Sequence, residues 1–300
     1  MRILITGATG FVGSNIARRL VKEGFDVHIV IRQTSNLELI SDVKENLNIH
    51  IHDGTTEGII EIVRLSNPEV VFHLASLFIV EHKANDIDNI IRSNILFGTQ
   101  LLEAMKQIGI DKMINTGTCW QHFNNQDYNP VNLYAATKQA FEDILKFYVE
   151  TTLLRVITLK LFDTYGPNDK RPKIINLLKK AAKENTVLEM SPGEQLIDLV
   201  YIDDVVEAYM IALDRLLNNK VKHHEVYAVS SGNPVSLRKI VEIYEEICGK
   251  KLNIQWGKRP YRIREVMTPW NRGAKLEGWE PKVSLYDGLK KILIADGNYT

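Results

Sequence analysis

The chain opens with an aliphatic run that leads directly into three closely spaced glycines. Residues 2–6 read RILIT, residues 6–13 read TGATGFVG, and an amphipathic pattern follows over 13–23. Glycine lets a backbone turn tightly and approach a ligand without a Cβ in the way, and a helix starting there offers free N–H groups to an anion. Although the spacing is G-x-x-G-x-x-G, the order strand, glycine loop, helix predicts a dinucleotide site. Its residues would be Gly7, Thr9, Gly10, Phe11, Val12 and Gly13.

Strand-like runs alternate with helix-like patterns through the first half of the chain. Strands are expected at 2–6, 26–32, 47–53, 69–75, 111–117 and 153–161, and long helices at 90–109 and 133–150. This alternation predicts an α/β fold, a Rossmann-type doubly wound parallel sheet. The elements become shorter after residue 165. We therefore expect an NAD(P)-binding Rossmann domain over 1–165 and a smaller C-terminal α/β substrate domain over 166–300, interleaved with the first and sharing a cleft with it.

Composition excludes several classes of function. Lys+Arg and Asp+Glu both total 37, so the charge balance predicts neither a nucleic-acid nor a membrane partner. The two cysteines, Cys119 and Cys248, lie far apart, which favours a reducing compartment, and we expect a cytoplasmic protein. The histidines at 223–224 and at 50 and 52 have no acid or cysteine at ligand spacing, so no metal site is expected.

The end of the second predicted strand bears on the choice of cofactor. An acid about 20 residues after the glycine loop binds the ribose 2′-hydroxyl of NAD, whereas an arginine accommodates the 2′-phosphate of NADP. This chain has Arg32 there, followed by QTSN. We expect NADP(H), with NAD(H) as the alternative. Asp53, at the end of the third strand, is placed either to meet the adenine ring or to cap its own loop.

A tyrosine and a lysine stand four residues apart in YAATK, at 134–138. On a helix this spacing puts Tyr134 and Lys138 on one face. A phenol titrates near pH 10, and a neighbouring ammonium lowers that pKa, so the tyrosine can exchange a proton with a substrate oxygen. Thr116 and Thr118 come at the end of the fifth strand, at the edge where open α/β sheets bind ligands. Such a pair also occurs by chance on many helices, so the order of the surrounding motifs carries the prediction.

That order resembles the short-chain dehydrogenase/reductase superfamily in its extended branch, the NAD-dependent epimerase/dehydratase family. The resemblance covers essentially the whole chain. Its carriers are TGATGFVG (6–13), VFHLAS (71–76), NILFGTQLLEA (94–104), NTGT (115–118), YAATK (134–138), LFDTYGP (161–167), DLVYIDDVVEAY (198–209) and GWEP (278–281).

The resemblance implies a role for each matching residue. Tyr134 would be the general acid/base, Lys138 would lower its pKa and bind the nicotinamide ribose, and Thr118 would bind the reacting oxygen, with Thr116 as the competitor for that role. Asn94 would distort its helix or hold a water. Further cofactor contacts are implied for Arg32, Asp53, Gly54, Leu74, Ala75, Ser76, Asn94, Thr116 and Leu161. Substrate contacts are implied for Ser76, Thr118, Cys119, Trp120, Asp163, Lys173 and Arg262. A homodimer is implied, through the two long helices.

The loop after the fifth strand narrows the implied reaction. Sugar dehydratases of the family look like Thr-Asp-Glu where this chain has Thr118, Cys119 and Trp120. A 3,5-epimerase needs two further acid/base groups, for which Cys119 and His122 are candidates unless they only pack the loop. A 4-ketoreductase needs only Tyr, Lys, Thr and NADPH.

The segments at 193–209 and 264–281 are similar to nucleotide-sugar 4-ketoreductases of the CDP-abequose and CDP-paratose synthase kind. The chain departs from the extended branch at Ile197, where that branch carries an arginine for the sugar nucleotide. We therefore expect NADPH-dependent reduction of the 4-keto group of a nucleotide-linked deoxyhexose, with hydride going to C4 and a proton coming from Tyr134. A 4-epimerase with bound NAD and a non-catalytic nucleotide sensor are the alternatives.

Overall fold

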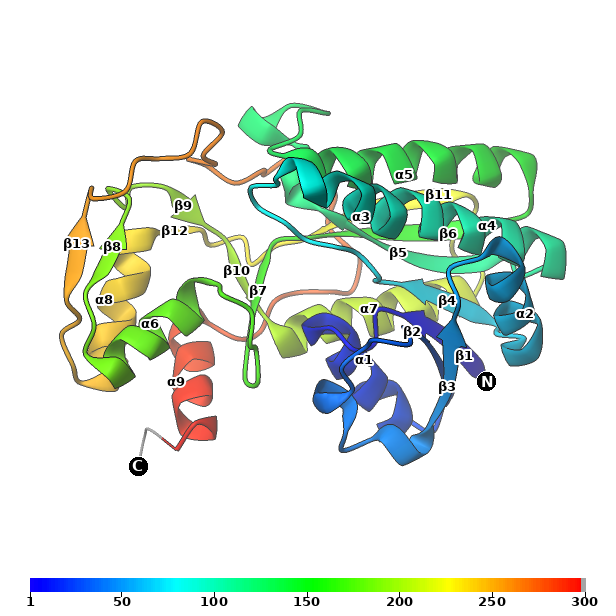
Figure 1. The fold of residues 1–300 in the computed structure, drawn as a ribbon, viewed down its shortest axis with the longest axis horizontal. Helices are drawn as coiled ribbons and strands as arrows, with labels where there is room; N and C mark the ends of the chain where they lie inside the picture. Colours follow the sequence, from blue (N-terminus) through cyan, green and yellow to red (C-terminus); the bar gives the residue numbers. More distant parts are fainter. Residues whose placement is uncertain (298–300) are drawn as a thin grey trace.

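The aliphatic runs expected to be strands form one seven-stranded parallel sheet (Figure 1). Its order is β11-β6-β5-β4-β1-β2-β3. We describe residues 1–297 of a computed structural model. The sheet strands are β1 Arg2–Thr6, β2 Asp26–Arg32, β3 Leu47–His52, β4 Val70–His73, β5 Lys112–Thr118, β6 Arg155–Leu161 and β11 His224–Val229. This order confirms the predicted Rossmann-type sheet. Because β2 and β4 flank β1 on opposite sides, the strand order reverses beside β1, where such sheets bind ligands.

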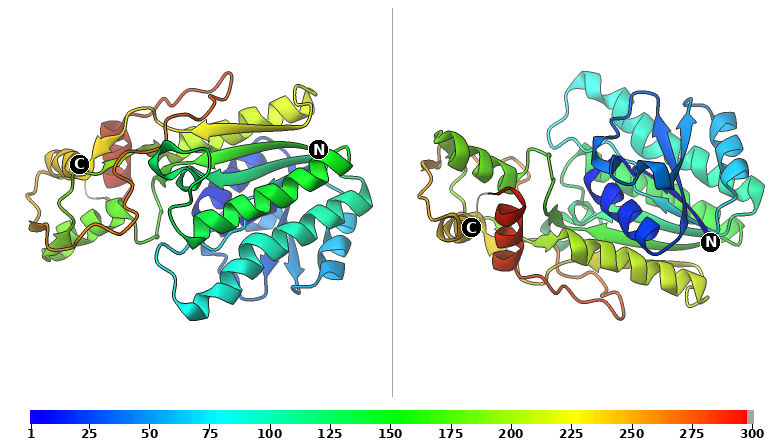
Figure 2. Two further views of the ribbon diagram at one scale, coloured as in Figure 1. Left: turned by 90° about the horizontal axis from the view of Figure 1, so that it is seen from above. Right: turned by 90° about the horizontal axis from the view of Figure 1, so that it is seen from below.

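Two helical layers cover the sheet, one on each face. Successive residues of a strand point to opposite faces, so the apolar strands present a surface to bury on both sides. Ile3, Ile5 and Phe72 pack with α1 (Phe11–Lys22) and α7 (Ile202–Leu217), which are seen from below in Figure 2. On the other face, residues such as Leu4 and Val71 pack with three helices, of which α4 and α5 are prominent from above. Those three helices are α2 Thr56–Ser66, α4 Phe97–Ile108 and α5 Leu133–Thr151. No helix within residues 1–297 is long and apolar enough to cross a membrane.

The helix expected over residues 90–109 is interrupted in the structure. It comprises α3 (Ile87–Ile91), a π-helical turn (Arg92–Leu96) and α4. A π turn inserts an extra residue into the helical ladder, and Asn94 sits inside it. The sequence pattern predicted one continuous helix, because a single inserted residue barely disturbs apolar periodicity.

The second half of the chain contributes to both ends of the molecule. A smaller lobe holds the remaining helices and three two-stranded sheets, β7 with β10, β9 with β12 and β8 with β13 (Figure 1). Its elements are β7 Asp163–Tyr165, α6 Ile174–Glu184, β8 Leu188–Met190, β9 Leu196–Ile197, β10 Leu199–Tyr201, β12 Val235–Ser236, α8 Leu237–Cys248, β13 Ile254–Trp256 and α9 Leu285–Ala295. By contrast, α7 and β11 return to complete the central sheet unit.

Candidate active site

The glycine loop forms a bare backbone cradle at the start of α1. Gly7 has φ +77°, and a Cβ there would lie 2.6 Å from the backbone nitrogen of Ala75. A Cβ on Gly13 would lie 2.2 Å from the carbonyl oxygen of Gly7. Gly10 occupies the N-cap of α1, with no side chain to cap the helix. The free N–H groups of this helix start are suited to a pyrophosphate, so the loop fits a dinucleotide cofactor.

The other residues predicted to bind the cofactor follow the carboxyl ends of the strands. Arg32 ends β2 and is exposed, and its backbone N–H donates to Ser35 Oγ. Oδ1 of Asp53 accepts hydrogen bonds from the backbone N–H and the hydroxyl of Thr55, both at 2.8 Å. This carboxylate therefore caps its own loop, the alternative role considered for it. The remaining members of the set at these strand ends are Gly54, Leu74, Ala75, Ser76, Thr116 and Leu161. Phe11 is buried beneath the guanidinium of Arg171, whose Cζ is 4.5 Å from the ring centroid.

The cap of α5 places Tyr134 and Lys138 in the first turns of that helix. Asn132 Oδ1 accepts from the backbone N–H of Ala135 at 3.0 Å, while its Nδ2 donates to the carbonyl of Val80 at 2.9 Å. The start of α5 is thereby fixed to the loop after β4. The Tyr134 ring meets Phe78 edge to face at 4.9 Å. Lys138 is only 1% exposed, so its ammonium lies inside the protein.

Burial dominates the ionisation of this pair. It raises the pKa of Tyr134 to about 12, and a hydrogen bond with Ser76 opposes the shift. Burial also lowers the pKa of Lys138 to about 8, and the negative charge of Glu142 opposes that shift. The expectation that the lysine brings the phenol below its ordinary pKa of 10 is therefore not met within the polypeptide, because desolvation disfavours both charged forms. Burial thus favours the protonated form of Tyr134.

The two threonines at the end of β5 have different hydrogen-bond partners. Thr116 Oγ1 shares a 2.7 Å hydrogen bond with the hydroxyl of Tyr209 in α7. Thr118 Oγ1 accepts from the backbone N–H of Trp120 at 3.3 Å and caps the short turn Cys119–Gln121. The fully buried Tyr209 therefore engages Thr116, which favours Thr118 over Thr116 as the hydroxyl available to a substrate.

Asn94 connects three segments around this site. Its Oδ1 accepts from the backbone N–H of Leu77 at 2.7 Å, and its Nδ2 donates to the carbonyl of Leu77 at 3.1 Å and to Thr137 Oγ1 at 2.9 Å. Ser76 Oγ also donates to Oδ1, at 3.3 Å. The π turn thus holds the loop after β4 against α5.

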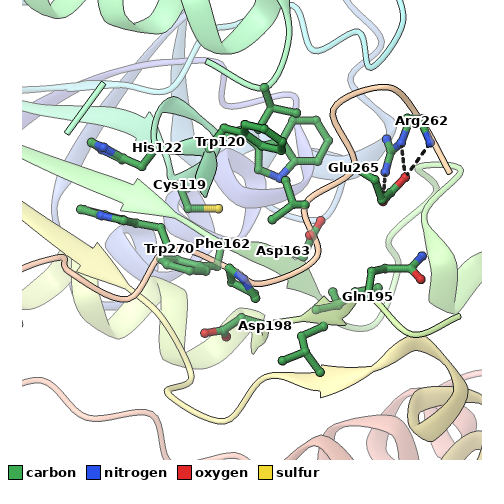
Figure 3. Close-up of a pocket in the computed structure, with 16 residues that line it drawn as sticks. Cys119, Trp120, His122, Phe162, Asp163, Gln195, Asp198, Arg262, Glu265 and Trp270 are labelled. Atoms are coloured by element: carbon green, nitrogen blue, oxygen red, sulfur yellow. Dashed lines mark hydrogen bonds and ion pairs between the residues drawn. The ribbon is translucent and has the colours of Figure 1, made fainter. Parts of the chain in front are cut away.

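A cleft opens beside the loop that follows β5 (Figure 3). One part of its wall is apolar and aromatic, and the other part carries acids, one amide and one arginine. The apolar wall includes Phe123, Val131, Phe162, Ile197, Pro269 and Trp270. The polar wall includes Asp163, Gln195, Asp198, Arg262 and Glu265. Among the predicted substrate residues, Cys119, Trp120, Asp163 and Arg262 line this cleft.

Both predicted substrate-binding cations have carboxylate partners. Lys173 Nζ lies 2.7 Å from Asp163 Oδ1. An Arg262 Nη is 2.8 Å from Glu265, and dashed lines mark this pair in Figure 3. Each cation also lies over an aromatic ring, since Lys173 Nζ is 5.5 Å from the centroid of Phe78 and Arg262 Cζ is 5.9 Å from that of Trp120. An anionic ligand can exchange with either carboxylate. Sequence reasoning did not single out Phe78 or Glu265.

His122 and Cys119 do not supply acid/base groups near neutral pH. His122 Nε2 accepts from Lys160 Nζ at 2.8 Å, its Nδ1 lies 3.1 Å from the carbonyl of Gln126, and its ring stacks on Trp270 at 4.0 Å. Burial, together with the Lys160 charge, lowers the pKa of His122 to about 4. Burial also raises the pKa of the Cys119 thiol. These contacts favour the packing role considered for both residues.

Three other histidines have local partners. His28 Nδ1 and His50 Nε2 are 2.9 Å apart, and His224 Nε2 is 2.8 Å from Thr158 Oγ1. Across residues 1–297, no three His, Cys, Asp or Glu side chains are arranged to hold a metal ion.

Comparisons with known proteins agree on one family. A sequence model described as the NAD dependent epimerase/dehydratase family matches residues 3–229. The CDP-abequose synthase of Yersinia pseudotuberculosis is 30% identical over 272 residues, 90% of this chain and 92% of that protein. The UDP-glucuronic acid 4-epimerase of Bacillus cereus, solved with UDP-glucuronic acid and NAD, has a TM-score of 0.86 at 26% identity and full coverage of both chains. The UDP-glucose 4-epimerase of Thermotoga maritima shares the fold, with a TM-score of 0.87 at 24% identity and 99% coverage of both chains.

Proposed function

Because the chain belongs to the NAD-dependent epimerase/dehydratase family, and is thus an NAD(P)-dependent enzyme of nucleotide-sugar chemistry, we propose that it reduces the 4-keto group of a nucleotide-linked deoxyhexose with NADPH. The observation that carries this proposal is the geometry of the site, in which Tyr134 and Lys138 begin α5 and the cap of that helix is bonded to the loop after β4. Burial raises the pKa of Tyr134 to about 12, in keeping with a proton donor. A reductase begins its chemical step with a protonated acid beside the carbonyl oxygen. An enzyme that first oxidises its substrate needs a base at the same place.

Different residues of the chain have different roles in this reaction. The nicotinamide supplies the hydride that goes to C4 of the sugar. We assign the cofactor phosphates to the glycine loop and a 2′-phosphate to Arg32, which is exposed at the end of β2. Tyr134 donates its proton to the new alkoxide, Thr118 positions that oxygen, and the Lys138 ammonium stabilises the phenolate that forms.

The cleft supports a deoxysugar nucleotide as substrate. Cys119 and Trp120 follow Thr118, so these two positions have no carboxylate to assist dehydration. The apolar wall suits a sugar ring that lacks a hydroxyl, because each unpaired buried hydroxyl is costly. Lys173 and Arg262 are placed to receive the diphosphate in exchange for their carboxylates. The relation to a CDP-abequose synthase agrees with this class.

A second candidate is a nucleotide-sugar 4-epimerase with resident NAD. The likeness to the Bacillus cereus 4-epimerase solved with NAD favours it. We also propose a homodimer through α4 and α5, since Phe147 on α5 is 58% exposed; light scattering with size-exclusion chromatography measures the mass directly.

The deciding experiment is NADPH oxidation against a panel of nucleotide-linked 4-keto sugars, with the C4 configuration of the product determined by NMR. We expect stoichiometric NADPH consumption, and loss of most turnover in Tyr134→Phe with NADPH binding retained. Purified protein that carries tightly bound NAD and interconverts 4-epimers without consuming NADPH would establish the epimerase instead.

A further inference from the structure

A buried carboxylate lies between two buried lysines beneath the candidate site. Glu142 is 7% exposed, and Lys138 and Lys160 are 1% and 4% exposed. Glu142 follows Lys138 by one helical turn on α5, so both side chains are on one face of that helix. Its Oε2 lies 3.4 Å from Nζ of Lys160, which comes from β6. Buried charges are costly unless they are paired, so this arrangement needs a reason.

The neighbouring strand leaves room for the carboxylate. A Cβ on Gly117 of β5 would lie 2.9 Å from Glu142 Oε1 and 3.0 Å from Lys160 Cγ. Among the residues that the structure describes, Oε1 has no hydrogen-bond donor. The carboxylate is thus ion-paired with Lys160 and acts on Lys138 through its charge, and its second oxygen has no donor among the described residues.

Lys160 continues this chain of charges into the substrate cleft. Its Nζ donates to Nε2 of His122, the ring stacked on Trp270 in the cleft wall. Asp143 and Cys119 also act on Lys160, and the Lys160 charge acts in turn on His224. At the other end, His73 of β4 lies close enough to Lys138 for the ammonium to disfavour its protonation. Glu142 is thus the group that favours the charged form of both lysines.

We propose that Glu142 is a positioning residue for the proposed reduction: its shared carboxylate keeps the Lys138 ammonium charged on the helix face of Tyr134 and, through Lys160, fixes the His122 ring in the cleft wall. Lys160 competes with Lys138 for this carboxylate. The inference rests on the proposed function, in which Lys138 must be charged to stabilise the phenolate.

This competition predicts that Glu142→Gln and Lys160→Met shift the alkaline limb of the kcat–pH profile in opposite directions. Loss of the carboxylate in Glu142→Gln should move the alkaline limb of the kcat–pH profile lower by about one unit, the scale of one nearby opposite charge. Lys160→Met leaves the whole carboxylate to Lys138, so the limb should move to higher pH. Glu150→Gln changes an exposed glutamate of the same helix and should leave the profile unchanged.

Glu142→Gln would leave the buried Lys160 without its carboxylate partner and could fail to fold, so a second variant is needed. Glu142→Gln/Lys160→Met removes both charges together, and its alkaline limb should still move lower. Circular dichroism establishes folding for each protein. Variants that lose kcat while the limb stays in place would show that Glu142 acts only through packing and would overturn the proposal.

A readout that needs no substrate separates this inference from the proposed function. Lysine labelled with ¹³C at Cε gives an NMR titration of Lys138, whose resonance is assigned by its disappearance in Lys138→Met. We expect the apparent pKa of Lys138 to fall in Glu142→Gln and to rise in Lys160→Met. An unchanged titration overturns the role of Glu142 even if the enzyme reduces 4-keto sugars. Shifted titrations without any reductase activity would support the electrostatic role and reject the reaction.

Discussion

Replacing Gly13 by alanine should loosen the glycine loop even without cofactor. A Cβ on residue 13 would lie 2.2 Å from the Gly7 carbonyl oxygen and 2.9 Å from Cα of Ala8. These are backbone atoms, which cannot rotate away, so the end of β1 and the start of α1 must move apart. Overpacking of this kind costs about 1–3 kcal/mol. At roughly 2 °C per kcal/mol for a chain of this size, we expect Tm to fall by about 2–6 °C.

Gly10→Ala is the matched control within the same loop. Its Cβ would lie 3.3 Å from the Gly7 carbonyl oxygen, and its φ of −86° is open to any residue. We expect little change in Tm but weaker NADPH binding, because the added methyl group stands on the exposed side of the loop. Thermal unfolding without nucleotide and calorimetric titration with NADPH measure the two effects. A wild-type Tm for Gly13→Ala would refute the packing argument, and wild-type NADPH affinity in both variants would remove the pyrophosphate from this loop.

Three further changes probe the cofactor, the histidines and the π turn. Arg32→Ala should raise KM for NADPH about tenfold and leave KM for NADH within about twofold, since only the 2′-phosphate loses a charged hydrogen bond; equal changes for both cofactors would place the 2′-phosphate elsewhere. Burial and the nearby Lys138 charge lower the pKa of His73 from 6.5 to about 3, so the unfolded chain binds a proton at this histidine more readily than the folded protein does. The free energy of unfolding should therefore be highest above pH 6.5 and should fall by about 2 kcal/mol near pH 5. Urea unfolding midpoints measured above pH 6.5 and near pH 5 test this. If His73→Gln showed the same pH dependence as the wild-type protein, the role of His73 would be contradicted. Asn94→Ala should lower the free energy of unfolding by about 2–3 kcal/mol through its lost hydrogen bonds to Leu77 and Thr137; an unchanged urea midpoint would mean that other contacts hold the loop after β4.

Local rules were sufficient for much of the fold. The glycine loop could be predicted because positive φ and close backbone approach at Gly7 and Gly13 leave few alternatives to glycine. The helix face shared by Tyr134 and Lys138 follows from helical periodicity alone. The parallel sheet could also be predicted, since alternating strands and helices have few right-handed arrangements, but its seventh strand, β11, was not among the expected strands.

Features that depend on distant contacts could not be predicted. Thr116 is hydrogen-bonded to Tyr209, 93 residues later, and the sequence around Thr116 gives no sign that the Tyr209 hydroxyl lies there. The direction of the pKa shift of Tyr134 depends on burial, which a motif does not reveal. Glu142 did carry a signal, because it stands one helical turn after Lys138, yet its second partner comes from β6. A distortion of the helix at Asn94 was expected, but its form as a π turn depends on hydrogen bonds of Asn94 to Leu77 and Thr137, which belong to other segments.

The return of α7 and β11 to the central sheet has a consequence for biosynthesis. β6 pairs with β5 on one side and β11 on the other, and β11 ends only at Val229. A nascent chain therefore exposes a hydrogen-bonding strand edge at β6 until the ribosome has made most of the protein. We expect residues 1–165 expressed alone to aggregate, and a chain ending just after β11 to be more soluble; a soluble, monomeric 1–165 fragment would show that the strand edge is protected in some other way.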